Sequence, residues 1–243
     1  MNNTTPHNEK LGALLLGVFI FLGLTVLGWL LGTSAVRVKQ FERSVTVKGL
    51  SEREYPADVV IWPIQFTAAG DELQALYATI EDNTARVKRF LLAQGIAADD
   101  ITASAPALTD RSTQQYGNNA RPEFRYSALQ TLTVYSNDVD SVRAIMAKLS
   151  ELGKQGIAFT GGDYRSQTEY LFTRLNAVKP QMIEEATANA REVAQKFAAD
   201  SHSALGRIKR ASQGQFSIEP RDSNNPQIKK VRVVSTVEYY LAD

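Results

Sequence analysis

Apolar positions along the chain form one continuous run near the N-terminus and short periodic segments after it. Residues 11–36 include no charged side chain. A helix needs about 20 apolar residues to cross a bilayer core of about 30 Å, and Leu11–Leu31 alone meets this length. From Ser44 onward, apolar and polar residues alternate as in a water-exposed domain. The pattern therefore predicts a polar tail, a membrane span, a linker and a large domain, at residues 1–10, 11–33, 34–43 and 44–243.

The apolar run has two other interpretations. The apolar core of a cleaved secretory signal usually has about 7–15 residues, which is shorter than this run. Thr33-Ser34-Ala35 resembles a cleavage triplet, but Thr33 stands where a smaller residue is preferred. A helix buried in the core of a soluble protein is the remaining alternative. The length of the run favours a retained single-pass anchor.

Flanking charges leave the orientation of this span open. Lys10 precedes it, and the basic residues between Arg37 and Arg43 follow it. A positive-inside count would place the large domain in the cytoplasm, but long domains are translocated largely regardless of such charges. Gly28 and Gly32 form a small-xxx-small pair that lets two spans approach closely, although glycine is common in membrane helices.

Between Ala57 and Phe172, the apolar spacing alternates between the period of a strand and that of a helix. The order is strand, helix, strand, strand, helix, strand, with strands at 57–69, 101–109, 124–136 and 157–172. Asp71 is expected to cap the first helix, and Asn137 or Asp138 the second. This order is typical of a ferredoxin-like, split βαβ unit, an α+β fold in which helices cover one face of an antiparallel or mixed sheet.

Glycine and proline predict where several elements stop or bend. Gly49 is expected to end a first strand at Ser44–Leu50, and Gly95 to end the first helix. Pro63 has no N–H for a strand ladder, so its strand is expected at a sheet edge or with a bulge. Gly161-Gly162 marks a bulge or a bend in the strand that follows the second helix.

A long alanine-rich helix and a C-terminal β-hairpin complete the domain. Lys179–Asp200 has its apolar residues on one narrow stripe, and the small alanines predict close packing against a sheet or another helix. Pro180 fits a first helical turn or kinks an earlier one. Strands are expected at Arg207–Ile218 and Ile228–Leu241, and the second alternates so that one face is core. The stripe comprises Ile183, Ala186, Ala190, Val193, Ala194 and Phe197.

Composition excludes some partners and chemistries. A formal net charge of +1 gives no electrostatic reason to expect nucleic acid as a partner. The chain has no cysteine, which excludes thiolate nucleophiles, disulfides and cysteine-based zinc sites. The absence of cysteine fits an exported domain, but cytosolic chains can lack it too.

Few residues offer catalytic or metal-binding chemistry. His7 lies in the polar tail and His202 follows a helix end, where it suits the helix dipole; neither has a second histidine at metal-binding spacing. The closest acidic pairs, Asp99-Asp100 and Asp138/Asp140, fall at expected element starts, where aspartate caps helices and turns. No Gly-x-Ser-x-Gly motif occurs, and Gly161-Gly162-Asp163 lacks the spacing of a phosphate loop.

Clusters of basic and aromatic residues have ordinary structural explanations. Lys229-Lys230-x-Arg232 and Arg207-x-Lys209-Arg210 fit a solvated sheet face or ion pairs with Glu219 and Glu238 better than contact with anionic lipid or a cell-wall polymer. The aromatic residues fit strand or core packing better than a ligand-stacking platform. They are Trp62, Tyr116, Phe124, Tyr126, Tyr164 and Tyr170. The sequence thus predicts no catalytic residue, no cofactor and no metal.

Several short motifs resemble the SIMPL domain family of bacterial envelope proteins. They are Val47-Lys48-Gly49, Pro56-Ala57-Asp58, Gly95-Ile96, Asp99-Asp100-Ile101-Thr102, Leu205-Gly206 and the closing strand Val233–Leu241. The family's Pro-Asp is interrupted here by Ala57. The resemblance implies a periplasmic α+β domain with no known enzyme activity and a tendency to self-assemble. It also implies an orientation opposite to that of the positive-inside count: the span lies in the inner membrane, residues 1–10 form a cytoplasmic tail, and the domain lies outside the cytoplasm.

Three functions are consistent with these observations. The first is a non-enzymatic, membrane-anchored envelope protein that acts by self-association, as a homo-oligomer, or by binding a partner. The second is a module that captures a small ligand or a cell-wall fragment between the sheet and the Lys179–Asp200 helix. The third, a hydrolase with paired carboxylates, requires two acidic side chains that converge in a cleft with raised pKa values.

Overall fold

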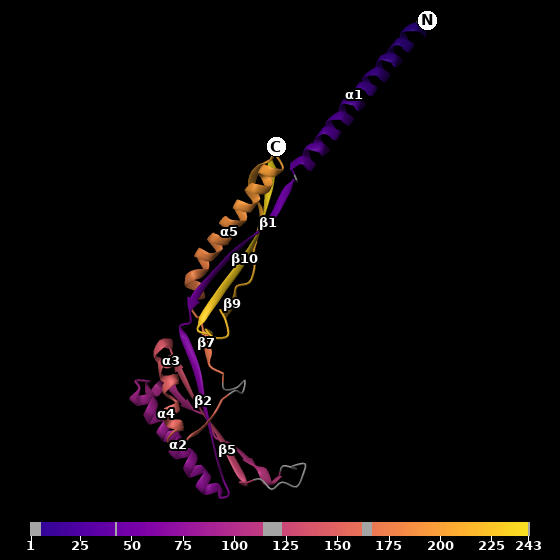
Figure 1. Ribbon diagram of the computed structural model, residues 1–243. Coiled ribbons are helices and arrows are strands. Elements are labelled where there is room, and N and C mark those ends of the chain that lie inside the picture. Colours follow the sequence, from indigo (N-terminus) through magenta and orange to yellow (C-terminus); the bar gives the residue numbers. More distant parts are fainter. Residues whose placement is uncertain (1–5, 42, 114–122, 162–166, 243) are drawn as a thin grey trace. The chain divides into compact units, whose positions relative to one another are not determined.

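The computed structural model describes residues 6–41, 43–113, 123–161 and 167–242, and Figure 1 labels its helices and strands. The chain forms two compact units. Unit 1 lies within Met1–Ser51, Gln181–Phe216 and Val233–Asp243, and unit 2 within Glu52–Pro180 and Ser217–Arg232. Three long elements contribute residues to both units: β1 (Ser44–Pro56), α5 (Leu175–Asp200) and β10 (Ile228–Ala242).

The apolar run folds as a single helix. α1 spans Pro6–Phe41, and its apolar part, Gly12–Ser34, has a mean hydropathy of 2.6. None of this part is buried, whereas the core helix of a soluble protein is mostly buried. At about 1.5 Å per residue it is about 35 Å long, enough to cross a bilayer. The helix is compatible with a membrane span or a signal sequence, and it continues through most of the 34–43 segment expected to be a linker.

Unit 2 contains the expected ferredoxin-like arrangement. Two long strands lie side by side at the centre of a six-stranded sheet: β2 (Val59–Gly70) and β5 (Tyr126–Ser136). Beyond β5 lie β3 (Ile101–Ala103) and β4 (Ala107–Asp110), and beyond β2 lie β6 (Ala158–Thr160) and β7 (Glu169–Leu171). These pairings are antiparallel. The α+β fold class with a split βαβ order is therefore confirmed.

Helices cover one face of this sheet (Figure 1). They are α2 (Leu73–Ala93), α3 (Val139–Lys148) and the short α4 (Ser150–Gly153); two 3-10 turns, η1 (Ala98–Asp100) and η2 (Arg111–Thr113), adjoin β3 and β4. Even-numbered residues of β2 and β5 point into the core beneath the helices, and most of them are buried, Phe66 and Leu132 completely. Odd-numbered residues of the same strands therefore occupy the opposite face.

Pro63 is not in the edge strand or at the bulge that its sequence context predicts. β2 is a central strand, and Pro63 lies opposite Thr133 of β5 in an unbroken register. On the other side, β6 pairs with Gln65–Thr67 and β7 with Val59–Ile61, so residues 62–64 face a gap between two short strands. A residue without an N–H fits beside such a gap.

The helix ends predicted from the sequence are confirmed at Asp138 and Gly95, and the prediction for Asp71 is wrong. Asp138 caps α3, and its Oδ1 accepts a hydrogen bond from the Ser141 N–H at 3.0 Å. Gly95, with a φ of 94°, follows the end of α2 as expected. Asp71 does not cap α2; its Oδ1 accepts from the Arg125 N–H instead, and the cap residue of α2 makes no side-chain bond.

Two of the expected strands are divided. The 101–109 segment forms the separate strands β3 and β4, and the 157–172 segment forms β6 and β7. Gly161 follows β6, whereas Gly162 lies outside the described residues. Short outer strands are tolerated here because each needs to pair only with part of the longer β2 or β5.

Unit 1 is built on a second sheet, in which β10 lies between β1 and β8 (Ala204–Gln213). β8 pairs antiparallel with β10, as expected for the C-terminal hairpin. In unit 2, β9 (Ser217–Pro220) pairs with the start of β10. Odd-numbered residues from Val231 to Tyr239 are buried, so the predicted alternation of the last strand is confirmed.

α5 packs on this sheet through a stripe of small side chains. The buried residues recur at every fourth position: Met182, Ala186, Ala190, Ala194 and Ala198. Val193 and Phe197, expected in the stripe, are 37% and 55% exposed because they fall beside this line of contact. The helix begins at Leu175, so Pro180 lies inside it rather than in its first turn.

Gly49 lies beneath α5 and does not end β1, which continues well beyond it. A Cβ at this position would overlap the Ala186 carbonyl and the Ala190 N–H. Only glycine allows the helix backbone to approach so closely. Beside this contact, Asn189 Nδ2 donates to the Leu50 carbonyl at 2.8 Å. Gly49 therefore serves the packing of helix on strand.

Candidate ligand-binding pocket

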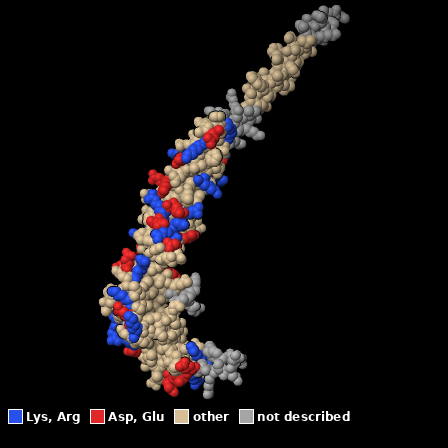
Figure 2. Space-filling model, viewed as in Figure 1, with Lys and Arg blue, Asp and Glu red and all other residues tan. Residues whose placement is uncertain are grey.

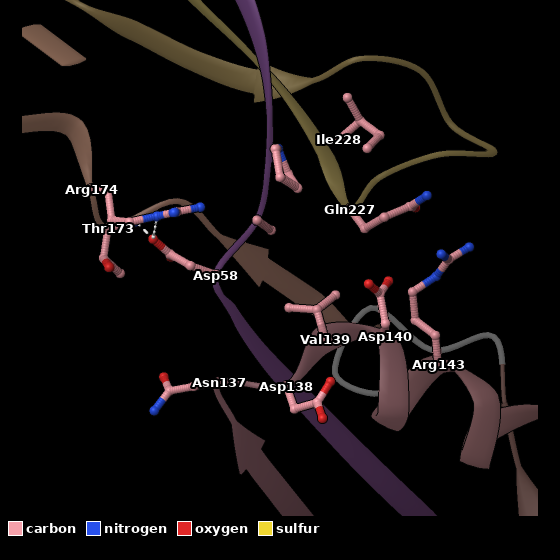
Figure 3. A pocket seen from close by; sticks show the side chains of 12 residues that line it. Asp58, Asn137, Asp138, Val139, Asp140, Arg143, Thr173, Arg174, Gln227 and Ile228 are labelled. Carbon is pink, nitrogen blue, oxygen red and sulfur yellow. Dashed lines mark hydrogen bonds and ion pairs between the residues drawn. The ribbon is translucent and has the colours of Figure 1, made fainter. Parts of the chain in front are cut away.

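A pocket of about 710 Å³ opens in unit 2 where four segments meet (Figure 3). Its walls are the link between β1 and β2 (56–58), the turn and first part of α3 (137–143), the residues after β7 (173–174) and the start of β10 (227–228). Sites for small ligands typically measure about 300–1,000 Å³. The pocket therefore has the size of a small-molecule site.

Asp58 ties two of these segments together. Its Oδ1 accepts a hydrogen bond from the Thr173 N–H at 2.8 Å, and its Oδ2 forms an ion pair with Arg174 Nε at 2.9 Å (Figure 3). Burial by itself raises the pKa of Asp58, but the Thr173 N–H and the Arg174 guanidinium outweigh burial and hold this pKa below its ordinary value of 3.8. Asp58 is thus an ionised acceptor that fixes the chain after β7.

The first turns of α3 form the opposite wall. The Asp138 carboxylate accepts the Ser141 hydroxyl at 2.6 Å and the Ser141 N–H at 3.0 Å, and these two bonds lower its pKa. Asp140 and Arg143 project from α3 toward Gln227 (Figure 3). A carboxylate and a guanidinium therefore stand near each other on one wall.

Gln227 brings the start of β10 to the pocket. Its carbonyl accepts the Ala57 N–H at 2.8 Å. Its side chain is only 8% exposed, and its Oε1 has no hydrogen-bond partner among the residues that the structure describes. A buried acceptor without a partner costs roughly 1–3 kcal/mol. The pocket wall thus contains a polar group whose hydrogen bond the described protein does not supply.

These groups favour binding over proton transfer. A general acid at neutral pH needs a raised pKa, whereas Asp58 and Asp138 have lowered ones. Asp140 and Arg143 present both signs of charge, which matches a ligand that carries an acidic and an amine group. The arrangement can hold such a ligand by charge and hydrogen bonding.

Most of the chain, including the pocket, matches one protein family. The family model of SIMPL, described as a protein of unknown function (DUF541), covers residues 45–239. The chain belongs to the SIMPL family. The matched SIMPL region runs from β1 to β10 and leaves out α1. No curated protein matches the chain.

The short motifs that resemble SIMPL proteins lie at packing and turn positions. Gly49 underlies α5, and Asp58, from the interrupted Pro-Asp, binds Arg174 at the pocket. Gly95 follows α2, and Gly206 leaves so little room that a Cβ there would lie 2.9 Å from the Tyr240 carbonyl oxygen. The glycine motifs thus reflect folding constraints, and only Pro56-Ala57-Asp58 belongs to the pocket.

The acidic pairs and histidines of the SIMPL chain are not gathered into one site. Asp138 and Asp140 line the pocket, whereas Asp99 and Asp100 lie in η1 and do not. His202 is exposed in the turn after α5, with a φ of 51°, and the side chain of His7 lies outside the described part of the chain. Within that part, no three acidic or histidine side chains are grouped as metal ligands.

The basic residues are mostly interspersed with acidic ones on the face shown in Figure 2. Lys209 Nζ pairs with Glu238 Oε1 at 3.0 Å, as expected, and Lys230 lies opposite Glu219 in the strand register. Lys229 differs from the expected solvated residue because it is only 8% exposed, and burial lowers its pKa. No ion pair to Lys229 is formed by the residues described.

The aromatic residues follow the expected packing in part. Trp62 and Tyr170 are buried in the core, whereas Tyr116 and Tyr164 lie outside the described residues. The sequence offered no signal for three pocket residues, Arg143, Arg174 and Gln227, because none belongs to a recognisable local pattern. They reach the pocket only through the way that the chain folds.

Proposed function

We propose that this SIMPL protein is a non-catalytic, membrane-anchored protein whose SIMPL region lies on the periplasmic side of the inner membrane and acts by self-association or partner binding. The observation that carries the proposal is α1, whose 23-residue apolar part precedes the SIMPL region and is exposed along its length. A continuous apolar surface of this size is unfavourable in water. A bilayer covers it, and the retained helix holds the SIMPL region at the membrane.

The pocket chemistry supports a role without catalysis. Asp58 and Asp138 are occupied by hydrogen bonds that fix the backbone, and their lowered pKa values leave them ionised at neutral pH. Neither can donate a proton there. Binding needs only complementary shape and charge, so it demands less of these residues than hydrolysis does.

Two measurements test the location and the anchor. Alkaline phosphatase fused after Asp243 is expected to be active, since this enzyme folds only after export, and a cytoplasmic fluorescent reporter at the same place is expected to be dark. The intact chain, beginning at Met1, is expected in carbonate-washed membranes by mass spectrometry. An inactive phosphatase with a bright cytoplasmic reporter would refute the location, and a chain cleaved after Ala35 would refute the anchor.

The pocket favours a second candidate function, the capture of a small ligand such as a cell-wall fragment with carboxylate and amine groups. The sequence placed such a site beside the Lys179–Asp200 helix, whereas the observed pocket lies against α3. Its volume and its mixed charges carry this alternative.

A thermal-shift series with soluble peptidoglycan fragments tests the capture of a ligand. A ligand that binds only the folded state adds about 2.7 kcal/mol to the free energy of unfolding at 100 times its Kd, and Tm rises as a result. The shift is expected to be lost in Arg143→Ala, which removes a pocket cation, and kept in Arg89→Ala, which removes one from α2 outside the pocket. The same shift in both variants, or no shift at millimolar fragment, would reject this function.

A further inference from the structure

The face of the six-stranded sheet opposite the helices is depleted of charge. Odd-numbered residues of β2 and β5 occupy it, from Ile61 to Ala69 and from Ser127 to Tyr135, and none of them is charged. The neighbouring strands add uncharged residues such as Thr102 and Thr109. Two charged side chains also lie at this face: Glu169 of β7, and Arg111 after β4, whose Nε donates to Ser127 Oγ at 3.3 Å. In the whole chain 22% of residues are charged. We call this surface the open face; depletion of charge is the compositional signature of an interface core.

The open face has a hollow toward one end and a protruding aromatic ring toward the other. The hollow measures about 470 Å³, and its lining includes Thr67, Leu129 and Arg111. Tyr135 is 50% exposed, and Ser127, which also lines the hollow, lies about 26 Å from it along β5 at about 3.3 Å per residue. Thr131 lies midway between Ser127 at the hollow and Tyr135. The face therefore carries a knob and a hole on the two sides of one central residue.

The size of the open face suits a stable interface. β2 has 12 residues, which extend about 40 Å at about 3.3 Å each. Four strands lie across the sheet, and at about 4.8 Å apart they extend about 19 Å. The face thus offers about 750 Å², close to the roughly 800 Å² that each partner buries in an interface of standard size.

We propose that the open face binds the open face of a second copy of this chain, about a two-fold axis at Thr131. The axis lies between the two sheets and perpendicular to β5, so that the two β5 strands run in opposite directions. This operation places Tyr135 of each copy over the hollow of the other. Arg111 at the hollow then meets the ring of the partner's Tyr135, a cation–π contact.

A second copy fits this face better than a partner of another kind. A two-fold interface must be complementary to itself, and a knob and a hole at equal distances from the axis meet that requirement. The central strands of this face are uncharged, and Glu169 and Arg111 are of opposite sign, so the face offers no electrostatic complement to a strongly acidic or basic partner. The inference names the surface by which the proposed self-association occurs, and it rests on that proposed function.

Substitutions on the open face test the inference in the full chain in detergent micelles, with the Kd of dimerisation measured by analytical ultracentrifugation. Thr131→Arg puts a charge at the axis and Tyr135→Ala removes the knob; each is expected to weaken dimerisation about 30-fold or more, as for an interface hot spot. Ala85→Arg on the exposed side of α2 is the control and is expected to leave the Kd unchanged. Circular dichroism and Tm verify that each variant is folded.

Crosslinking gives a second readout. The natural chain has no cysteine, so Thr131→Cys introduces a unique thiol. A bismaleimide that reaches about 10 Å, the spacing of packed sheets, is expected to join two copies of Thr131→Cys and not two copies of Ala85→Cys.

The possible outcomes separate this inference from the proposed function. A wild-type chain that stays monomeric at every accessible concentration would overturn both the open-face dimer and self-association. An oligomer that survives Thr131→Arg and is not crosslinked through Thr131→Cys would overturn the open-face dimer alone. If that oligomer were lost in Gly28→Leu, α1 would be the element that holds it together.

Discussion

Replacing Gly49 by alanine tests whether the close approach of α5 to β1 stabilises unit 1. The added Cβ would overlap backbone atoms of Ala186 and Ala190 and lie 2.9 Å from Ala190 Cβ, so the helix itself has to move. Moving two turns of a helix about 10 Å wide outward by about 1 Å opens about 100 Å³. At about 24 cal/mol per Å³ this costs about 2.5 kcal/mol.

Two smaller effects adjust this value. Separation of helix and strand breaks the bond from Asn189 to the Leu50 carbonyl, which contributes about 1 kcal/mol. Alanine gains about 0.5 kcal/mol over glycine in a strand, because it loses less backbone freedom on folding. The expected destabilisation is therefore about 3 kcal/mol, a large share of the roughly 5–15 kcal/mol that holds a domain folded.

Hydrogen exchange of the full chain, followed by mass spectrometry, measures this loss. Amides of α5 within residues 186–198 are expected to exchange about 100-fold faster in Gly49→Ala. Gly70→Ala is the matched control, since Gly70 also lies in a strand but no atom lies within 4 Å of an added Cβ. Ala190→Gly is not expected to rescue Gly49→Ala, because the overlap involves backbone atoms. Equal exchange in Gly49→Ala and Gly70→Ala would refute the reasoning.

Three further predictions concern single side chains. Asp58→Asn is expected to destabilise unit 2 by about 1.5–3 kcal/mol, because bonds to an ionised acceptor are lost. The folded pKa of Asp58 lies below 3.8, so the stability from this group is present above pH 3.8 and is lost as pH falls through the folded pKa. The urea midpoints of the wild-type and Asp58→Asn chains, measured by Trp62 fluorescence in a Trp29→Phe background, should therefore converge in acid. Lys229→Met is expected to raise stability, because burial lowers the pKa of Lys229 in the folded chain. Between that lowered pKa and 10.5 the unfolded chain binds more protons than the folded chain, so the wild-type urea midpoint should rise with pH in this window and that of Lys229→Met should not. A lower midpoint in Lys229→Met than in the wild type would contradict the prediction. Asp138→Ala is expected to cost about 1 kcal/mol as a lost helix cap, seen as faster amide exchange at the start of α3, with Asp140→Ala as a control that costs less than half as much.

The candidate pocket shows how far local sequence signals reach. Asp138 is recognisable because an aspartate before an apolar helical stripe is the signature of a cap, and Asp58 because it stands in a short motif. Their pairing into one site is not recognisable. Arg174 and Asp58 are 116 positions apart, and no local periodicity relates them. Gln227 comes from a third segment and has no distinguishing context in the sequence.

The sequence by itself determined the apolar helix α1, the order of strands and helices from Ala57 to Phe172, and the buried face of β10. Each is a repeat of apolar residues at the spacing of one element, so neighbours along the chain contain all the information. Tertiary structure decided the central position of Pro63, the burial of Lys229 and the role of Gly49. These depend on which distant strand or helix packs against the residue, and the free energy of that packing overrides the local preference of proline for edges, lysine for water and glycine for strand ends.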